Sequence, residues 1–282
     1  MKKPAGVVLL IAWLLSGCSD LEKAGEASGK LFIIGGGKRP SGMVQRMIQE
    51  AGLDTAGYIV ILPMASSEPD TAVFYSKRQF MELGVTNIAD FRFTKETAAT
   101  PTQLDSLENA ALIYITGGDQ NAFMEIVAGS PVEEAIKICY QNGGMVAGTS
   151  AGAAVMSEKM ITGNELRQTD YRETFRTIEA ANIELGKGLG LITTAIVDQH
   201  FVWRSRHNRL ITAVIENPEL KGIGIDEATA ILVTGKKAEV VGESQVLVLE
   251  NPERKSIINS TQKLGAPNLR LSVLLPGDTF DL

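Results

Sequence analysis

The chain contains short runs of apolar residues, separated by stretches in which apolar residues recur at helical spacing. Helical spacing occurs at residues 42–52, 71–83 and 121–128. The apolar runs are continuous rather than alternating, which is typical of strands buried on both faces and so of parallel sheets. These runs occupy residues 31–34, 58–62, 87–93 (the weakest), 111–115, 145–147, 194–197 and 222–225. The pattern predicts strands and helices that alternate around a largely parallel sheet.

From residue 230 onward the pattern becomes strand-rich, with further apolar runs at 239–241, 245–249 and 271–275. We interpret this part as an antiparallel flank, because no segment is long or polar enough to be a linker to a second domain. A chain of 282 residues can bury a large core in one domain. The predicted fold is therefore α/β, a three-layer sandwich with a mostly parallel central sheet and antiparallel strands at its C-terminal flank, formed by residues 31–282 as a single domain.

Residues 143–154 combine a short apolar strand, a glycine-flanked serine and a run of small residues that opens a helix. Gly148, Ser150 and Gly152 form the pattern G-x-S-x-G, in which a tight strand-to-helix turn holds a nucleophilic serine above the sheet. Both glycines are required because the turn brings backbone segments too close for a Cβ. Ser150 is therefore the candidate nucleophile, and an ordinary strand–helix turn is the alternative.

A serine nucleophile needs a base at neutral pH, and the chain has two histidines. His200 follows the run at 194–197, so we expect it at a strand end, on the same rim of the sheet as Ser150. His207 falls on the polar side of a predicted helix and is interpreted as a surface residue. His200 is the candidate base.

The base in turn needs an acid to orient it, and three acids are candidates: Asp198, Asp226 and Glu227. Asp226 and Glu227 follow the run at 222–225, and adjacent residues on an extended chain point in opposite directions. Spacing alone does not separate the three. The order serine, histidine, acid differs from the order in α/β-hydrolases, which argues against that fold.

Two glycine clusters follow predicted strands. The cluster at 35–37 lacks the spacing of a phosphate-binding loop and of a dinucleotide-binding fingerprint, so nucleotide binding is disfavoured. The second cluster includes Gly118, at the carboxyl end of a strand, where open α/β sheets place ligands. The N–H groups of Gly118 and Ala151 are candidate oxyanion-hole donors, and an ordinary turn at 117–120 is the alternative.

The first residues have the features of a signal peptide. Lys2 and Lys3 precede an apolar run at 7–15 that is too short to span a bilayer comfortably. We therefore assign residues 1–17 to a signal peptide that is cleaved, with a plain secretory signal as the alternative to a lipoprotein signal.

The residues around the predicted cleavage site, 15–18, read Leu-Ser-Gly-Cys and resemble the bacterial lipobox. This resemblance implies that Cys18 becomes the new N-terminus and carries lipid, followed by a polar tether that ends at residue 30. Because Ser19 rather than aspartate follows the cysteine, lipoprotein sorting implies the outer membrane of a bacterial cell envelope. Contact with a membrane is expected only through this anchor.

Composition limits the partners and the redox chemistry. The net charge of −6 provides no basic surface for nucleic acid, so that class of partner is excluded. Cys139 is the only cysteine besides Cys18, and its place on the apolar face of a predicted helix at 131–140 indicates a core residue. Two histidines cannot build a His-rich metal site, and no metal or cofactor is expected.

Residues 117–120, 148–153 and 198–201 form a distinctive set together with Arg204, Arg206 and Arg209. This set resembles the cyanophycinases, which are serine peptidases related to the aspartyl dipeptidase peptidase E. The likeness extends from about residue 30 to about residue 249. It implies a fold similar to class I glutamine amidotransferases, which is flavodoxin-like.

By position, the resemblance implies Ser150 as nucleophile, His200 as base and Glu227 as the orienting acid. It also implies a substrate pocket surrounded by Gln120, Asp198, Gln199, Arg204, Arg206 and Arg209. Residues 167–187 have no distinctive match, and this segment is where the pocket is expected to depart from the family.

The substrate implied by the resemblance is cyanophycin, a polyaspartate whose side-chain carboxyls are amide-linked to arginine, and the products are β-Asp-Arg dipeptides. Its terminal unit carries two carboxylates, which guanidinium groups bind in a bidentate manner. It also carries a guanidinium, which needs an acid such as Asp198 or Asp119. We expect a helix bearing Arg204, Arg206 and Arg209 beside the base; pairing of these arginines with surface carboxylates is the alternative.

Two other functions stay open at this point. One is a peptidase E-like enzyme that cleaves ordinary Asp-X dipeptides. The other is an anchored binding protein that captures an acidic polymer without hydrolysing it. The sequence also leaves a homodimer open.

Overall fold

The computed structural model describes residues 29–167, 170 and 174–282. The predicted signal peptide, the lipidation site Cys18 and most of the tether lie outside the described residues. Within the described part of the chain, no helix combines the length and the apolar character needed to cross a bilayer.

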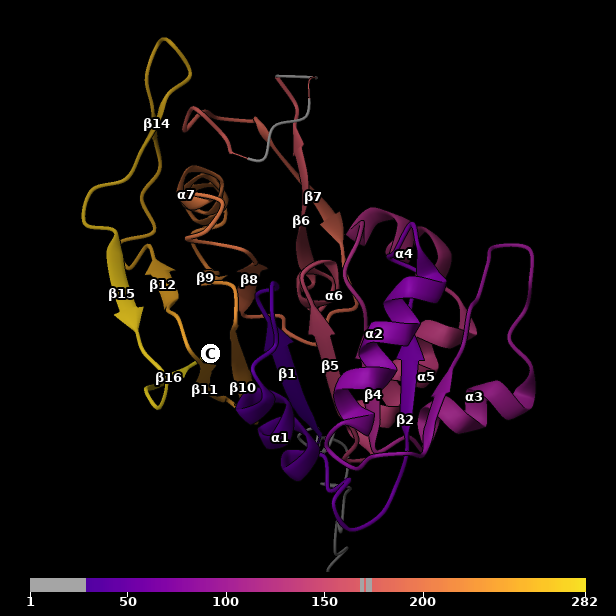
Figure 1. The fold of residues 1–282 in the computed structure, drawn as a ribbon. Helices are drawn as coiled ribbons and strands as arrows, with labels where there is room; N and C mark the ends of the chain where they lie inside the picture. Colours follow the sequence, from indigo (N-terminus) through magenta and orange to yellow (C-terminus); the bar gives the residue numbers. More distant parts are fainter. Residues whose placement is uncertain (1–28, 168–169, 171–173) are drawn as a thin grey trace, which may run out of the picture.

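A central sheet forms the middle layer of the domain (Figure 1), and among the described residues it has eight strands. Five of them run parallel in the order β1-β5-β4-β2-β3, and β10, β11 and β16 extend the β1 side in antiparallel pairs. Their bounds are β1 Lys30–Ile34, β2 Ile59–Leu62, β3 Ile88–Asp90, β4 Leu112–Ile115, β5 Met145–Thr149, β10 Thr229–Thr234, β11 Lys237–Gly242 and β16 Thr279–Asp281. The predicted α/β class, with its mostly parallel sheet and antiparallel C-terminal flank, is confirmed.

Helices cover both faces of this sheet, because successive side chains along each strand point to opposite faces. In β1, Phe32 and Ile34 pack with α1 and α2 on one face, whereas Leu31 and Ile33 belong to the core under α3, α4 and α5 on the other. The helices are α1 Ser41–Glu50, α2 Pro69–Met81, α3 Pro101–Glu108, α4 Gln120–Val127 and α5 Pro131–Gln141. The helices predicted at 42–52, 71–83, 121–128 and 131–140 are thus confirmed to within a few residues.

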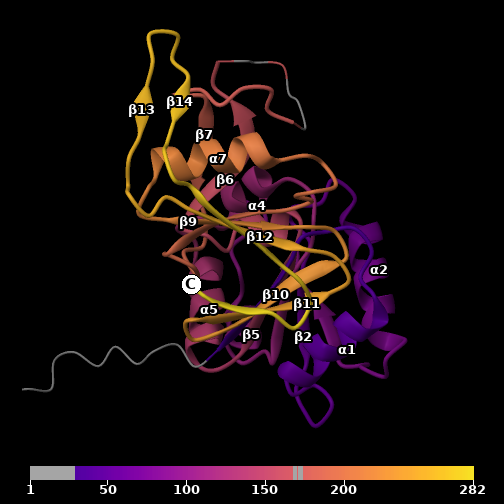
Figure 2. The same ribbon diagram turned by 90° about the vertical axis from the view of Figure 1, so that its left-hand side faces the viewer.

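A second sheet contains the strands that carry the predicted base and acid. Its order is β15-β12-β9-β8, with bounds β8 Ala195–Asp198, β9 Lys221–Ile225, β12 Val246–Glu250 and β15 Arg270–Leu274. Placing the runs at 194–197 and 222–225 in the central sheet was therefore wrong. One face of the second sheet packs on the central core, and α7 (His207–Glu216; Figure 2) covers β8, β9 and β12 on the other face. These three strands are therefore as apolar as those of the central sheet, whereas Leu271 and Val273 of β15 are exposed.

Two hairpins and a short helix complete the described chain. The hairpin of β6 (Lys159–Glu165) and β7 (Ile183–Lys187) has a bulge between Ile161 and Glu165, and α6 (Ala151–Ala154) follows β5 directly. The strands β13 (Ile257–Ile258) and β14 (Leu264–Gly265) form the second hairpin.

Candidate active site

Ser150 lies at the turn between β5 and α6 with φ +54° and ψ −111°, a strained backbone conformation for a residue with a side chain. Its N–H donates to the carbonyl of Ile34 (3.0 Å), which ties the turn to the end of β1. A Cβ at Gly148 would lie 2.2 Å from the carbonyl oxygen of Gly152, so the turn closes only with glycine there. The local sequence therefore forces the serine hydroxyl out of the sheet.

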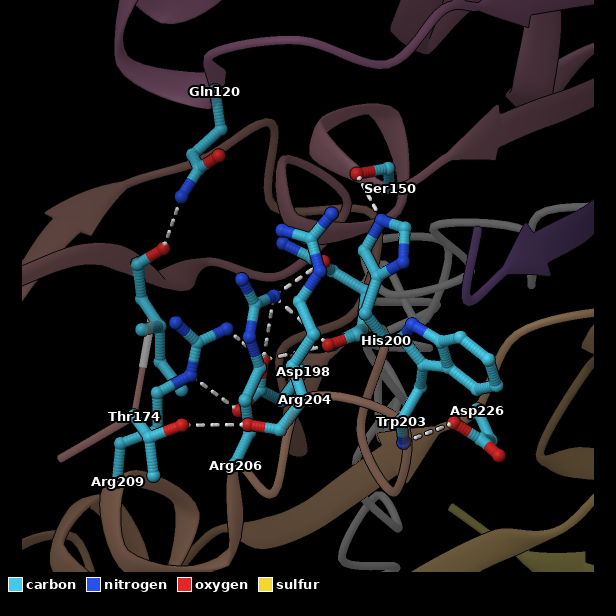
Figure 3. A network of polar contacts seen from close by, with 12 residues as sticks. Gln120, Ser150, Thr174, Asp198, His200, Trp203, Arg204, Arg206, Arg209 and Asp226 are labelled. Atoms are coloured by element: carbon cyan, nitrogen blue, oxygen red, sulfur yellow. Dashed lines mark hydrogen bonds and ion pairs between the residues drawn. The ribbon is translucent and has the colours of Figure 1, made fainter. Parts of the chain in front are cut away.

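His200 lies beside this hydroxyl, at the carboxyl end of β8 (Figure 3). The distance from its Nε2 to Ser150 Oγ is 2.8 Å, and from its Nδ1 to Glu227 Oε1 it is 2.6 Å. With Nδ1–H donating to the carboxylate, Nε2 of the neutral ring accepts the hydrogen bond of the serine hydroxyl. The structure thus brings the three predicted catalytic side chains into one hydrogen-bonded row.

The ring is held in the neutral form that a base requires. Burial lowers the pKa of His200 below its ordinary value of 6.5. The hydrogen bond with Glu227 opposes this lowering of the pKa, whereas the positive charges of Arg204 and Arg206 add to it. At pH 7 the imidazole is therefore available to accept a proton.

The three candidate acids have separate partners. Glu227 binds the base, as described. Asp226 is buried, and its Oδ1 accepts from the N–H groups of Val202 (3.1 Å) and Trp203 (2.9 Å), which places it under the turn that follows His200. The spacing of the sequence could not separate these acids because their roles depend on which segment each side chain meets.

The third acid, Asp198, is 1% exposed and pairs with Arg209 through both carboxylate oxygens; the Nε–Oδ2 distance is 2.7 Å, and Nη2 contacts Oδ1. Its carboxylate does not line the pocket described below. It is therefore not available to a substrate guanidinium, contrary to one expectation from the sequence.

The glycine loop at 35–37 packs directly on the base and its acid. A Cβ at Gly36 would lie 2.3 Å from His200 Cε1, and one at Gly37 would lie 2.6 Å from Glu227 Oε2. The carbonyl of Gly35 also accepts from the N–H of His200 (2.8 Å). This role of the loop was not predicted, because the sequence signals only a glycine cluster at the end of a predicted strand.

Gly117 and Gly118 lie over the nucleophile. A Cβ at Gly117 would be 3.2 Å from Ser150 Cβ, and Gly118 has φ +142°, where a Cβ would lie 1.9 Å from the carbonyl oxygen of Ala65. In the described part of the chain, the N–H groups of Gly118 and Ala151 have no acceptor. Both donors are thus unused, as the oxyanion-hole prediction requires, and their role stays a prediction.

A pocket of about 360 Å³ opens beside Ser150, a size within the range of small-molecule sites. It is lined by Gly118, Asp119, Gln120, Asn121, Ser150, Thr162, Gly163, Asn164, Gln199, Arg204, Arg206 and Arg209. The predicted residues Gln120, Gln199 and the three arginines are among them. Asn121 and the β6 residues 162–164 were missed, because nothing in their local sequence places the β6 bulge against α4.

Gln120 holds the β6 side of the pocket in place. Its Nε2 donates to the carbonyls of Ile161 (3.0 Å) and Thr162 (2.7 Å), and Asn121 Nδ2 also donates to Thr162 (3.2 Å). The start of α4 therefore holds the β6 bulge at the edge of the pocket.

The predicted arginine-bearing helix is wrong in part, because α7 begins only at His207. Arg204 and Arg206 lie in the turn before it, and Arg209 lies on the helix. The Nη1 of Arg206 donates to the Gln199 carbonyl (2.9 Å) and to its Oε1 (2.5 Å), which orients both side chains in the pocket wall. The Thr174 hydroxyl donates to the Arg204 carbonyl (2.9 Å; Figure 3) and helps to fix the turn.

Two further predictions concern residues outside the pocket. His207 is half-buried, and the centroid of its ring lies 4.9 Å from that of the Phe201 ring, so it is less solvated than expected. Cys139 is confirmed as a core residue; its Sγ donates to the Ala110 carbonyl, and burial raises the pKa of the thiol to about 12. No group of three or more potential metal ligands occurs among the described residues.

Comparisons with known proteins identify the family of this chain. Residues 31–241 match the profile of Peptidase family S51. The chain is 36% identical over 233 residues to the cyanophycinase of Trichormus variabilis, a match that covers 80% of this chain and 75% of that protein. It is 34% identical over 248 residues to the cyanophycinase of Geminocystis herdmanii, covering 85% and 87%. Its fold is similar to the crystal structure of a peptidase from an acI-B1 Actinobacterium, with a TM-score of 0.65, 22% identity and coverage of 92% and 98%.

Proposed function

Because the chain belongs to peptidase family S51, we propose that it is a serine peptidase that degrades cyanophycin and releases β-Asp-Arg dipeptides. The observation that carries this proposal is the row of Ser150, His200 and Glu227, with heavy-atom distances of 2.8 and 2.6 Å, at the edge of the pocket. This row has the composition and geometry of an acyl-transfer site.

In the first half-reaction, His200 Nε2 takes the proton of the Ser150 hydroxyl while Oγ attacks an aspartyl α-carbonyl of the substrate. Glu227 stabilises the imidazolium that forms and keeps Nε2 directed at the serine. The N–H groups of Gly118 and Ala151 donate to the oxyanion of the tetrahedral intermediate. When the intermediate collapses, Nε2–H protonates the departing amine and the acyl group stays on Oγ.

In the second half-reaction, water enters the place of the departed amine. His200 Nε2 removes a proton from this water as its oxygen attacks the acyl carbonyl. The second tetrahedral intermediate expels Ser150 Oγ, which regains its proton from Nε2. The product leaves with a free carboxylate, and the residues return to their starting state.

The charge of the pocket supports an anionic reacting unit. Arg204 and Arg206 lie on the turn that begins at the base, so positive charge flanks the position of the scissile bond. A terminal unit of cyanophycin carries two carboxylates, and guanidinium groups bind carboxylates through paired hydrogen bonds.

The proposal is tested by incubating cyanophycin with the wild-type protein, with Ser150→Ala and with Ser256→Ala, a matched change at an exposed serine. Mass spectrometry of the soluble products identifies β-Asp-Arg. We expect release by the wild type and Ser256→Ala and a loss of at least about 10³-fold with Ser150→Ala. Equal release by Ser150→Ala would refute the mechanism. Turnover of Asp-Leu without turnover of cyanophycin would refute the substrate.

We also propose that Cys18 is lipidated and anchors the enzyme in the outer membrane of a bacterial envelope. The support is the lipobox-like sequence at 15–18 and the serine that follows it. Membrane fractionation and mass spectrometry of the mature N-terminus test this proposal, with Cys18→Ala as the variant expected to leave the membrane. A homodimer stays a prediction that light scattering of the purified protein tests.

A further inference from the structure

The charged groups that line the pocket are unevenly distributed. The turn after β8 and the start of α7 contribute Arg204, Arg206 and Arg209, of which Arg209 is already paired with Asp198. Among the described residues that line the pocket, Asp119 is the only one with a carboxylate. The pocket therefore has a cationic side and a single anionic group, which lies on the loop between β4 and α4.

Asp119 is fixed close to the reacting centre. Gly117, two residues earlier, packs on Ser150, and the Asp119 N–H donates to the carbonyl of Ala65 (2.8 Å). Its Oδ1 accepts from the N–H of Asn121 (2.8 Å) and so caps α4. The side chain is exposed in the pocket and has no ion-pair partner within the described chain. A rigid loop thus presents a carboxylate to whatever occupies the pocket.

Other nearby carboxylates are already engaged. Asp198 is buried against Arg209, and Glu227 holds the base. Glu184 on β7 accepts from Thr162 Oγ1 (2.7 Å) and Asn164 Nδ2 (2.8 Å), behind the β6 wall of the pocket. These two hydrogen bonds lower the pKa of Glu184, and its negative charge is already engaged by the two donors.

We propose that Asp119 is the specificity-determining residue that binds the guanidinium group of the substrate. This inference rests on the proposed function, because a β-Asp-Arg unit carries one guanidinium as well as carboxylates. The carboxylates of the substrate bind to the arginine side chains of the pocket, and its guanidinium pairs with the carboxylate of Asp119. A pocket with both charges distinguishes an arginylated aspartyl polymer from plain polyaspartate.

The test compares two synthetic oligomers, one of β-Asp-Arg units and one in which citrulline, a neutral analogue of the same shape, replaces arginine. The enzyme variants are wild type, Asp119→Asn and the matched control Glu184→Gln. Asparagine retains the helix cap, so Asp119→Asn removes the charge and keeps the loop. A thermal melt checks that each variant is folded.

We expect the wild type to prefer the arginine oligomer by at least tenfold in kcat/KM. Asp119→Asn should reduce this ratio to near one and retain turnover of the citrulline oligomer, whereas Glu184→Gln should keep the wild-type ratio. An unchanged ratio in Asp119→Asn, or its loss in Glu184→Gln instead, overturns the inference and leaves the proposed function standing. If the wild type hydrolyses neither oligomer nor cyanophycin, the proposed function fails and this inference fails with it.

Discussion

Replacing Gly36 by alanine is expected to lower kcat by on the order of 10²-fold, although Gly36 has no reacting atom. The added Cβ would lie 2.3 Å from His200 Cε1 and 2.5 Å from Nε2. The loop cannot easily retreat, because the Gly36 carbonyl accepts from Ala228 N–H (3.0 Å) and the Gly35 carbonyl from His200 N–H (2.8 Å). The imidazole must therefore move.

The distance that the ring must move determines the expected loss of kcat. Ordinary contact begins near 3.4 Å, so the ring must shift by about 1 Å, and a misplacement of that size costs on the order of 10²-fold in rate. A displacement of this size is enough to take the 2.8 Å Nε2–Oγ contact out of hydrogen-bond geometry.

The assay is steady-state release of β-Asp-Arg, with Gly52→Ala as the control. Gly52 also has a positive φ (+69°), but no atom lies within 4 Å of a Cβ built there. The control therefore places a Cβ at a positive φ without the contact, although φ at Gly36 is +121°, and it should lose stability but not kcat. Wild-type kcat in Gly36→Ala, or an equal loss of kcat in Gly52→Ala, would refute this account of how the base is positioned.

Three further predictions follow from the site. Glu227→Gln removes the charge that stabilises the imidazolium, so kcat should fall by roughly 10²- to 10⁴-fold with little change in KM; retained kcat in steady-state assays would contradict this. Because burial lowers the pKa of His200 and only the neutral ring accepts a proton, kcat/KM should rise with pH through a midpoint below 6.5. Arg204→Gln removes a positive charge that lowers this pKa, so it should move the midpoint of the pH profile upward. A downward shift of the midpoint would contradict the assignment of His200 as the base. Arg209→Leu leaves the buried Asp198 with only the 4.0 Å contact to Arg206, so it should lower the free energy of unfolding in urea by up to about 3–5 kcal/mol. The double change Asp198→Asn, Arg209→Leu should recover part of the loss. A single variant as stable as the wild type would show that the pair is dispensable.

The parts of the site that the sequence predicted are those with local causes. The turn at Ser150 requires small residues two positions away on each side, so its geometry is visible within five residues. The base was found because the chain has two histidines and only His200 ends an apolar run. These arguments use the chain near each residue and need no knowledge of the tertiary structure.

What the sequence did not predict depends on distant segments. The residues 201–206 form a turn instead of a helix because Asp226, in the loop that follows β9, accepts from the N–H groups of Val202 and Trp203. The glycines at 35–37 make room for two side chains more than 160 residues away in the sequence. Continuous apolar strands reveal only that both faces are covered. Because α7 packs on β9 through Leu210 and Val214 while the other face of β9 joins the central core, β9 has the pattern of a central strand and the second sheet was not distinguished.

Asp226 and Glu227 are adjacent in the chain, yet one holds the turn that carries Arg204 and the other holds the base. Any evolutionary change that relocated the arginine by remodelling that turn would also disturb proton transfer. The β6 wall is under no such constraint, since in the described chain its residues 162–164 form no hydrogen bond with Ser150, His200 or Glu227. New substrate preferences can therefore evolve from the hairpin side of the pocket while the chemistry stays intact.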